Sequence, residues 1–261
     1  MKVVILCGGK GTRLREETEF RPKPMIPIGD RPILWHIMKT YAAQGHDEFI
    51  LCLGYKGDMI KEYFRNYLWM TSDVTLKLGP NSAVSYRDHH EEEDWCVTLA
   101  GTGENTLTAG RIKRIERYIG ADEHFLFTYG DGVGNVDIQG SIDFHRKHGK
   151  LLTLTAVRPP GRFSELTIDD ERNSAALNQN PQTAAGWING GYFVASRGLF
   201  DYLGEDSDQT MFEQEPMRRL VADGQVAAFH HNGFWQPMDT FDESALRNRL
   251  WRDGGAPWKV W

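Results

Sequence analysis

Residues 1–14, MKVVILCGGKGTRL, contain the feature that decides the fold, a short apolar run that ends at glycines. The run Val3–Cys7 is rich in β-branched residues and is bounded by turn-forming residues. A run of this kind is typical of a strand buried on both faces of a parallel sheet. We therefore predict a buried parallel strand over Val3–Cys7, with the glycine-rich segment lying beyond its carboxyl end.

Short apolar runs and helical patterns alternate along the rest of the chain. In Ile33–Tyr41, for example, Ile33, Ile37 and Tyr41 recur at helical spacing. This alternation predicts an α/β fold with a mainly parallel sheet and helices on both faces. The other expected helices are Met59–Leu68, Thr108–Tyr118, Ile138–His148, Met211–Asp223 and Phe241–Arg252, and the other expected strands are Phe49–Leu53, Phe125–Tyr129, Leu152–Val157 and Val226–Phe229.

Two stretches interrupt the alternation. Residues 74–100 contain three short strand-like runs, and residues 165–194 also have the pattern of hairpins. Both are expected to be small antiparallel insertions, or β-ribbons. Because no internal repeat or low-complexity linker divides the chain, we expect residues 1–261 to form a single domain.

The composition excludes several classes of protein. Of 261 residues, 40% are hydrophobic and 25% are charged, which excludes a mostly disordered chain. No apolar run approaches the roughly 18–20 residues that span a bilayer. The 30 Lys and Arg residues against 36 Asp and Glu give a net charge of -6, so we expect neither a nucleic-acid nor a membrane partner.

The cysteines and the first residues predict a cytoplasmic location. Cys7, Cys52 and Cys96 are odd in number and form no CxxC pair, so reduced thiols are expected rather than a disulfide framework or a zinc site. The initial apolar run of five or six residues leads into glycines and charges, which is not the pattern of a signal peptide.

The segment Gly8–Arg13 predicts an anion-binding loop. Glycines allow backbone N–H groups to approach a phosphate closely, and consecutive N–H groups can form an anion-binding concavity. Arg13 adds a fork of donors that matches phosphate oxygens. Lys23 follows between Pro22 and Pro24, which stiffen its backbone. From the residues alone, a strand-ending turn with incidental charges remains the alternative.

Two other phosphate-binding loops do not match. The P-loop requires GxxxxGK[ST], and the chain contains no such string. The dinucleotide fingerprint requires GxGxxG at the start of a helix, but Gly9 and Gly11 are followed by Leu14 where the third glycine would stand. The prolines at 22, 24 and 27 also prevent a long continuous helix there.

The string GGKGTRL at 8–14, followed by RPKPM at 21–25, resembles the signature of sugar-1-phosphate nucleotidylyltransferases. These enzymes join a nucleoside triphosphate to a phosphorylated sugar and release pyrophosphate. Between Met1 and Lys259 the chain is similar to one branch, the glucose-1-phosphate cytidylyltransferases, in the strings RPILWHIMK, GYKGDMIKEYF, AGRIKR, FLFTYGDGV, PPGRF, INGGYFV, EQEP, FWQPMDT and APWK. The resemblance implies a Rossmann-like sheet of the nucleotide-diphospho-sugar transferase type.

The resemblance assigns a role to each candidate site residue. Asp131 in YGDGV and Asp239 in WQPMD match aspartates that bind Mg²⁺, an ion that takes one or two carboxylates plus phosphate oxygens and water. From the residues alone, each Asp could instead cap a turn, and 108 positions separate them. Arg13 and Lys23 match the catalytic cations. The nucleotide-binding set is Leu6, Gly8, Gly9, Gly11, Thr12, Arg13, Lys23, Arg111 and Asp131, and the acceptor-binding set is Gly130, Arg162, Gln179, Asn180 and Asn189.

One departure from the family bears on the acceptor. Relatives carry an E-K-P string whose glutamate contacts sugar hydroxyls and whose lysine contacts the acceptor phosphate. The matching stretch LNQNP has Gln179 and Asn180 at those positions, and no lysine lies between Lys150 and Lys259. A lost charge-assisted contact costs about 1.5–3 kcal/mol. Arg162 in PPGRF is the candidate for compensation, and otherwise the acceptor differs from glucose 1-phosphate.

The expected function is Mg²⁺-dependent transfer of CMP from CTP to α-D-glucose 1-phosphate, giving CDP-glucose and pyrophosphate. By resemblance, the product feeds dideoxysugar synthesis for surface polysaccharides such as the lipopolysaccharide O-antigen, and the protein is a homo-oligomer, a trimer or a hexamer. Two alternatives remain open at this point: transfer to a different phosphorylated acceptor, and a catalytically silent nucleotide-binding module.

Overall fold

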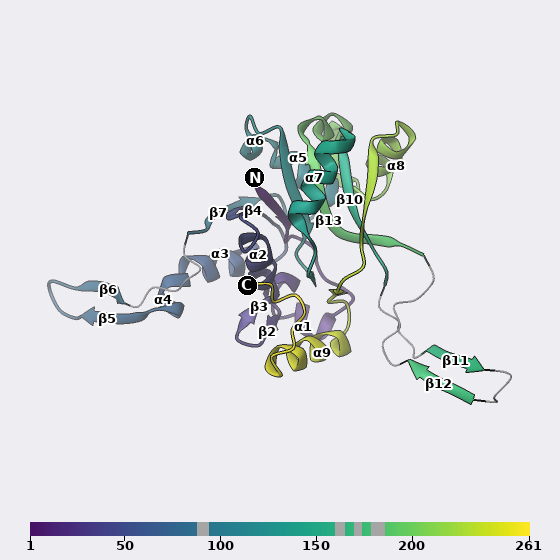
Figure 1. The fold of residues 1–261 in the computed structure, drawn as a ribbon. Coiled ribbons are helices and arrows are strands. Elements are labelled where there is room, and N and C mark those ends of the chain that lie inside the picture. The colour runs from purple at the N-terminus through teal and green to yellow at the C-terminus, as the bar shows by residue number, and fades with distance from the viewer. Residues whose placement is uncertain (88–93, 160–164, 170–173, 179–185) are drawn as a thin grey trace.

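A seven-stranded sheet forms the centre of the computed structural model, which describes residues 1–87, 94–159, 165–169, 174–178 and 186–261 (Figure 1). Its order from edge to edge is β14-β10-β13-β8-β1-β4-β7. The strands are β1 (Val3–Leu6), β4 (Glu48–Leu53), β7 (Cys96–Gly101), β8 (His124–Tyr129), β10 (Leu152–Val157), β13 (Ile188–Ser196) and β14 (Val226–His231).

Most neighbours in this sheet are parallel. β1 pairs in parallel with β4 and β8, β4 with β7, and β10 with β14. Only β13 runs antiparallel to both of its neighbours among the described strands. The predicted mainly parallel sheet is therefore confirmed, with its first strand at the position expected from the apolar run.

Helices cover both faces of the sheet, because successive side chains of a strand point to opposite faces. Val3 and Ile5 of β1 belong to the core on one face, together with residues of α2 (Ile33–Ala42) and α7 (Ile138–His148). Val4 and Leu6 belong to the core on the other face. That second core includes residues of α5 (Thr108–Arg114), α6 (Glu116–Ile119) and α8 (Glu215–Ala222).

The expected β-ribbons are shorter in the structure than in the prediction. In 74–100, β5 (Asp73–Lys77) and β6 (Ala83–Arg87) form a hairpin that projects from the body, but β7 joins the main sheet (Figure 1). In 165–194, β11 (Glu165–Asp169) pairs with β12 (Ser174–Asn178), but β13 joins the main sheet. A strand-like pattern does not reveal which strand a run pairs with, and this caused the difference.

Three helix boundaries differ from the prediction. The expected helix Met59–Leu68 is divided into α3 (Gly57–Arg65) and α4 (Tyr67–Thr71), and Thr108–Tyr118 is divided into α5 and α6. α8 begins at Glu215 rather than Met211, since Pro216 lies in its first turn, where a missing N–H costs nothing.

The remaining elements are short, except for α9, the terminal helix. α9 has the bounds that the sequence predicts. These elements are α1 (Arg15–Thr18), η1 (Lys23–Met25), β2 (Pro27–Ile28), β3 (Arg31–Pro32), β9 (Gly132–Gly134), η2 (Arg197–Tyr202), η3 (Glu205–Gln209), β15 (Trp235–Pro237) and α9 (Phe241–Arg252). In the described part of the chain, no helix has the length and apolar character needed to cross a membrane.

Candidate active site

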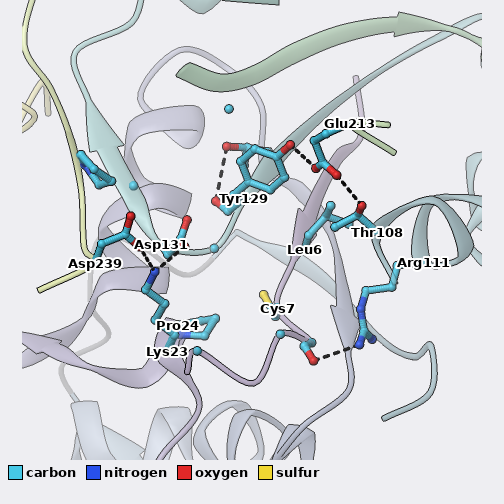
Figure 2. A pocket seen from close by; sticks show the side chains of 18 of the residues that line it. Leu6, Cys7, Lys23, Pro24, Thr108, Arg111, Tyr129, Asp131, Glu213 and Asp239 are labelled. Atoms are coloured by element: carbon cyan, nitrogen blue, oxygen red, sulfur yellow. Dashed lines mark hydrogen bonds and ion pairs between the residues drawn. The ribbon is translucent and has the colours of Figure 1, made fainter. Parts of the chain in front are cut away.

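A cavity of about 590 Å³ opens at the carboxyl ends of β1 and β8 (Figure 2). Ligands of open α/β sheets bind at this edge. Twelve of the predicted site residues line it: Leu6, Gly8, Gly9, Gly11, Thr12, Arg13, Lys23, Arg111, Gly130, Asp131, Asn189 and Asp239.

Lys23 joins the two predicted metal-binding aspartates. Its Nζ lies 2.7 Å from Asp131 Oδ2 and 2.6 Å from Asp239 Oδ1 (Figure 2). The two carboxylate oxygens are therefore no farther apart than the sum of these distances. The lysine side chain is 8% exposed, so this contact lies in a protected part of the cavity. The structure brings together groups that the sequence could only name separately.

The terminal helix holds Asp239 in place. Asp239 directly precedes Thr240, which caps α9 through a capping box with Glu243. The backbone N–H of Asp239 donates to Glu243 Oε2 at 2.6 Å. Arg247, also on α9 and fully buried, donates from Nη1 to the carbonyl of Pro237. α9 thus positions the backbone on both sides of Met238, next to the carboxylate.

The pair Asp131 and Asp239 fits a hard divalent cation. Carboxylate oxygens are the ligands that Mg²⁺ prefers, and one or two of them are usual when phosphates and water complete the shell. Among the described residues, no group of three or more His, Cys, Asp or Glu side chains could hold a metal. The two carboxylates already converge on one positive charge, the ammonium of Lys23.

Arg13 extends the cationic side of the cavity. Its Nη1 lies 2.5 Å from Asp239 Oδ2, while 73% of its side chain is exposed. A guanidinium this exposed can turn toward an anion in the cavity at little cost, because surface ion pairs are worth about 1 kcal/mol or less.

Arg111 fixes the loops at three strand ends. Its guanidinium is buried and donates to the carbonyls of Gly8 at 2.9 Å, Leu53 at 3.2 Å and Gly103 at 2.9 Å, and to Thr102 Oγ1 at 2.7 Å. A Cβ on Gly8 would lie 2.1 Å from Arg111 Nη1, so only glycine allows this approach. The predicted contact of Arg111 with a nucleotide stays a prediction, and what the structure adds is its bond to the first loop.

The other end of the cavity contains a carboxylate, Glu213, that forms no ion pair with any residue the structure describes. Glu213 accepts a hydrogen bond from the Tyr129 hydroxyl on Oε1 and one from Thr108 Oγ1, at 2.8 Å, on Oε2 (Figure 2). Burial, and then the adjacent Glu213 carboxylate, raise the pKa of Tyr129, so its hydroxyl stays protonated and donates. The cavity therefore has a second polar cluster made of hydroxyls and one carboxylate.

Cys7 lines the cavity but does not supply a nucleophile. It is fully buried, and burial raises the pKa of its thiol well above the ordinary value. The thiolate is the reactive form of cysteine, so this side chain is inert at neutral pH.

One family model, described as nucleotidyl transferase, matches residues 2–261. The chain belongs to the nucleotidyl transferase family. It is 50% identical to glucose-1-phosphate cytidylyltransferases of Salmonella typhi and of Salmonella typhimurium, over all of this chain and all of each relative. The predicted resemblance to that branch is confirmed.

A solved structure supports the fold of this nucleotidyl transferase. The crystal structure of HddC from Yersinia pseudotuberculosis superposes with a TM-score of 0.67, covering 96% of this chain and 99% of that chain, at 24% identity. At this identity the likeness bears on the fold alone.

Three predicted acceptor residues of the nucleotidyl transferase, Arg162, Gln179 and Asn180, lie outside the described residues. Asn189 is described: its Oδ1 accepts from the Gly191 N–H at 2.9 Å, and the residue lines the cavity. The roles of all four stay predictions.

Sequence reasoning missed the Glu213 cluster. Glu213 lies in EQEP, a string that carried part of the resemblance, but an isolated glutamate has no local signal of function. Thr108 begins α5 and Tyr129 ends β8, so only the folded sheet brings the three together. The other lining residues without an assigned role include Thr106, Leu107, Met211 and Trp235.

Proposed function

We propose that this nucleotidyl transferase transfers CMP from CTP to α-D-glucose 1-phosphate, giving CDP-glucose and pyrophosphate. The observation that carries the proposal is the convergence of Asp131 and Asp239 on Lys23 beside the glycine-rich first loop. Relatives that are 50% identical over their full length and carry the name glucose-1-phosphate cytidylyltransferase support the choice of substrates.

The proposed reaction is an in-line displacement at phosphorus. An oxygen of the acceptor phosphate forms a bond to the α-phosphorus of CTP, and the bond from that phosphorus to the bridging oxygen of the β-phosphate breaks. The electron pair leaves with pyrophosphate. A phosphate monoester is largely ionised at pH 7, since its second pKa is about 6, so no general base is required.

Catalysis in this scheme depends on alignment and on positive charge. Lys23 and Arg13, the proposed catalytic residues, face the triphosphate and hold it for attack. The backbone N–H groups of Gly8–Arg13, held by Arg111, bind its oxygens. Asp131 and Asp239 would hold Mg²⁺, which when bound neutralises charge on the phosphates.

The nucleotide occupies the side of the cavity lined by Leu6, Gly8, Gly9, Gly11, Thr12 and Arg111, and the acceptor occupies the side lined by Gly130 and Asn189. The resemblance adds Arg162, Gln179 and Asn180 to the residues that bind the acceptor. Residues 1–261 act as one nucleotidyltransferase domain within a homo-oligomer. The three free thiols suit the cytoplasm, where CTP is available. The product would serve nucleotide-sugar biosynthesis.

The test is pyrophosphate release from CTP with a panel of sugar 1-phosphates, in the presence and absence of Mg²⁺. Release with glucose 1-phosphate that requires Mg²⁺ is the expected result. If none of the acceptors in the panel supports pyrophosphate release, while CTP still binds, the proposal is overturned in favour of a silent nucleotide-binding module.

A second candidate is transfer to a different phosphorylated acceptor. The observation that favours it is Asn180, which replaces the lysine that relatives use for the acceptor phosphate, in a stretch without any lysine from 151 to 258. Release with another sugar phosphate of the panel, and not with glucose 1-phosphate, would support this candidate.

A further inference from the structure

Glu213 differs in its partners from Asp131 and Asp239, the two aspartates that line the same cavity. It lines the same cavity as Lys23 and Arg13, yet no ion pair among the described residues involves it. A half-buried negative charge repels phosphate and is costly to keep without a partner. Within a phosphorylated sugar, it therefore suits the groups that donate hydrogen bonds, which are the hydroxyls, rather than the phosphate.

Two hydroxyls fix the position of Glu213 and use only part of its capacity to accept hydrogen bonds. Thr108 Oγ1 accepts from the Phe212 N–H at 2.8 Å, so its single hydrogen goes to Glu213 Oε2. The Tyr129 hydroxyl donates its hydrogen to Oε1. An ionised carboxylate has about four lone-pair sites, and these two bonds use two of them. The carboxylate is thus preorganised, and no described residue is seen to donate a hydrogen bond to its remaining sites, which face a ligand in the cavity.

The sheet order places Tyr129, one partner of this carboxylate, beside the strand of the predicted acceptor residue Asn189, while the other partner, Thr108, lies on α5. Tyr129 ends β8, which lies between β1 and β13 in the sheet. β13 is the strand that carries Asn189. The glycine-rich loop follows β1 on the opposite side of β8. Figure 2 shows Glu213 and Tyr129 together at one end, with Lys23 and the two aspartates at the other.

We infer that Glu213 binds a hydroxyl of the acceptor sugar and is a specificity-determining residue of the transfer reaction. The inference rests on the proposed function, because it needs a phosphorylated sugar in the cavity. It supplies a carboxylate contact with the sugar in a chain whose E-K-P glutamate is replaced by Gln179.

The experiment compares Glu213→Ala with the wild-type protein in steady-state kinetics with CTP, Mg²⁺ and glucose 1-phosphate. A hydrogen bond to a charged group predicts that the KM for glucose 1-phosphate rises about ten- to hundredfold. The KM for CTP is expected to stay unchanged. Glu215→Ala is the matched control: Glu215 is exposed, pairs with Arg219 at 3.6 Å and does not line the cavity.

A series of monodeoxyglucose 1-phosphates identifies the hydroxyl. For the wild-type protein, the KM is expected to be higher for the analogue that lacks the bound hydroxyl than for glucose 1-phosphate. For Glu213→Ala, this one difference in KM, called the deoxy penalty, is expected to disappear, while the differences for the other analogues remain. If Glu213→Ala does not fold, Glu213→Gln keeps the shape and removes the charge, and a smaller rise in the same KM is expected.

Two results overturn the inference and can be told apart. If the wild-type protein releases pyrophosphate with none of the sugar phosphates, the proposed function and this inference both fail. If the wild-type protein is active but the variants change the KM for CTP instead, or leave the deoxy penalty in place, only the inference about Glu213 fails.

Discussion

The two ends of the cavity both contain carboxylates, but their partners differ. At one end Asp131 and Asp239 share the ammonium of Lys23. At the other end, the described residues that bind Glu213 through their side chains are Tyr129 and Thr108, each through its hydroxyl. The first pair contacts a cation, while the second group accepts hydrogen bonds from uncharged hydroxyls. The comparison teaches that the partners of an acidic side chain, rather than its identity, decide which part of a substrate it can bind.

The largest effect is expected from Asp131→Asn, which removes one negative charge from the end of the cavity where Lys23 lies. Turnover with CTP is expected to fall about 10²–10³-fold, the loss typical of one preorganised electrostatic group. The measurement is pyrophosphate release at saturating substrates, with the thermal unfolding midpoint as a check on folding. Asp143→Asn is the matched control, because Asp143 is 65% exposed on α7. Near-normal turnover of Asp131→Asn would show that the pair Asp131 and Asp239 does not take part in the reaction.

The next effect concerns charge on the acceptor side. The resemblance assigns position 180 to the acceptor phosphate, so Asn180→Lys is expected to raise the affinity for glucose 1-phosphate about ten- to hundredfold. The KM for glucose 1-phosphate measures it. Gln182→Lys adds the same charge two positions away and serves as control. Equal gains from both variants, or none from Asn180→Lys, would argue that another cation such as Arg162 already fills the role.

Arg111→Lys tests the hydrogen bonds by which Arg111 joins the loops at three strand ends. A lysine offers three donors from one point instead of five in a planar fork, so buried carbonyls such as that of Gly8 lose a partner. The free energy of unfolding is expected to fall by about 1–3 kcal/mol, and the KM for CTP to rise. Urea unfolding measures the first quantity. Arg114→Lys, at an exposed pair with Asp208, is expected to change it by less than about 0.5 kcal/mol.

The smallest effect is expected from Thr108→Val, which removes one of the two hydroxyls that hold Glu213. An ordinary hydrogen bond contributes about 0.5–1.5 kcal/mol, so the KM for glucose 1-phosphate is expected to rise only severalfold. Thr210→Val, at a partly exposed threonine that donates to the Asp206 carbonyl and does not line the cavity, is the control. A rise in the KM for CTP instead would place the nucleotide, and not the acceptor, at the Glu213 end.

Local patterns predicted the sheet well, because apolar runs such as Val3–Cys7 report burial directly. They did not predict that β7 and β13 join the sheet, since partner choice depends on contacts far apart in the sequence. The same limit applies to the site. Asp131 and Asp239 were named by resemblance, but only the fold shows that they meet at Lys23. Glu213 had no assigned role because its partners come from α5 and β8.

The position of α9 has a consequence for synthesis of the chain. Lys23 is made before Asp239 and the helix that caps it, because Asp239 follows 216 residues later in the chain. Asp239 is held in place only once α9 has been released, so a partly translated protein, or one cut before this helix, would have both aspartates but would lack the Glu243 contact that positions Asp239.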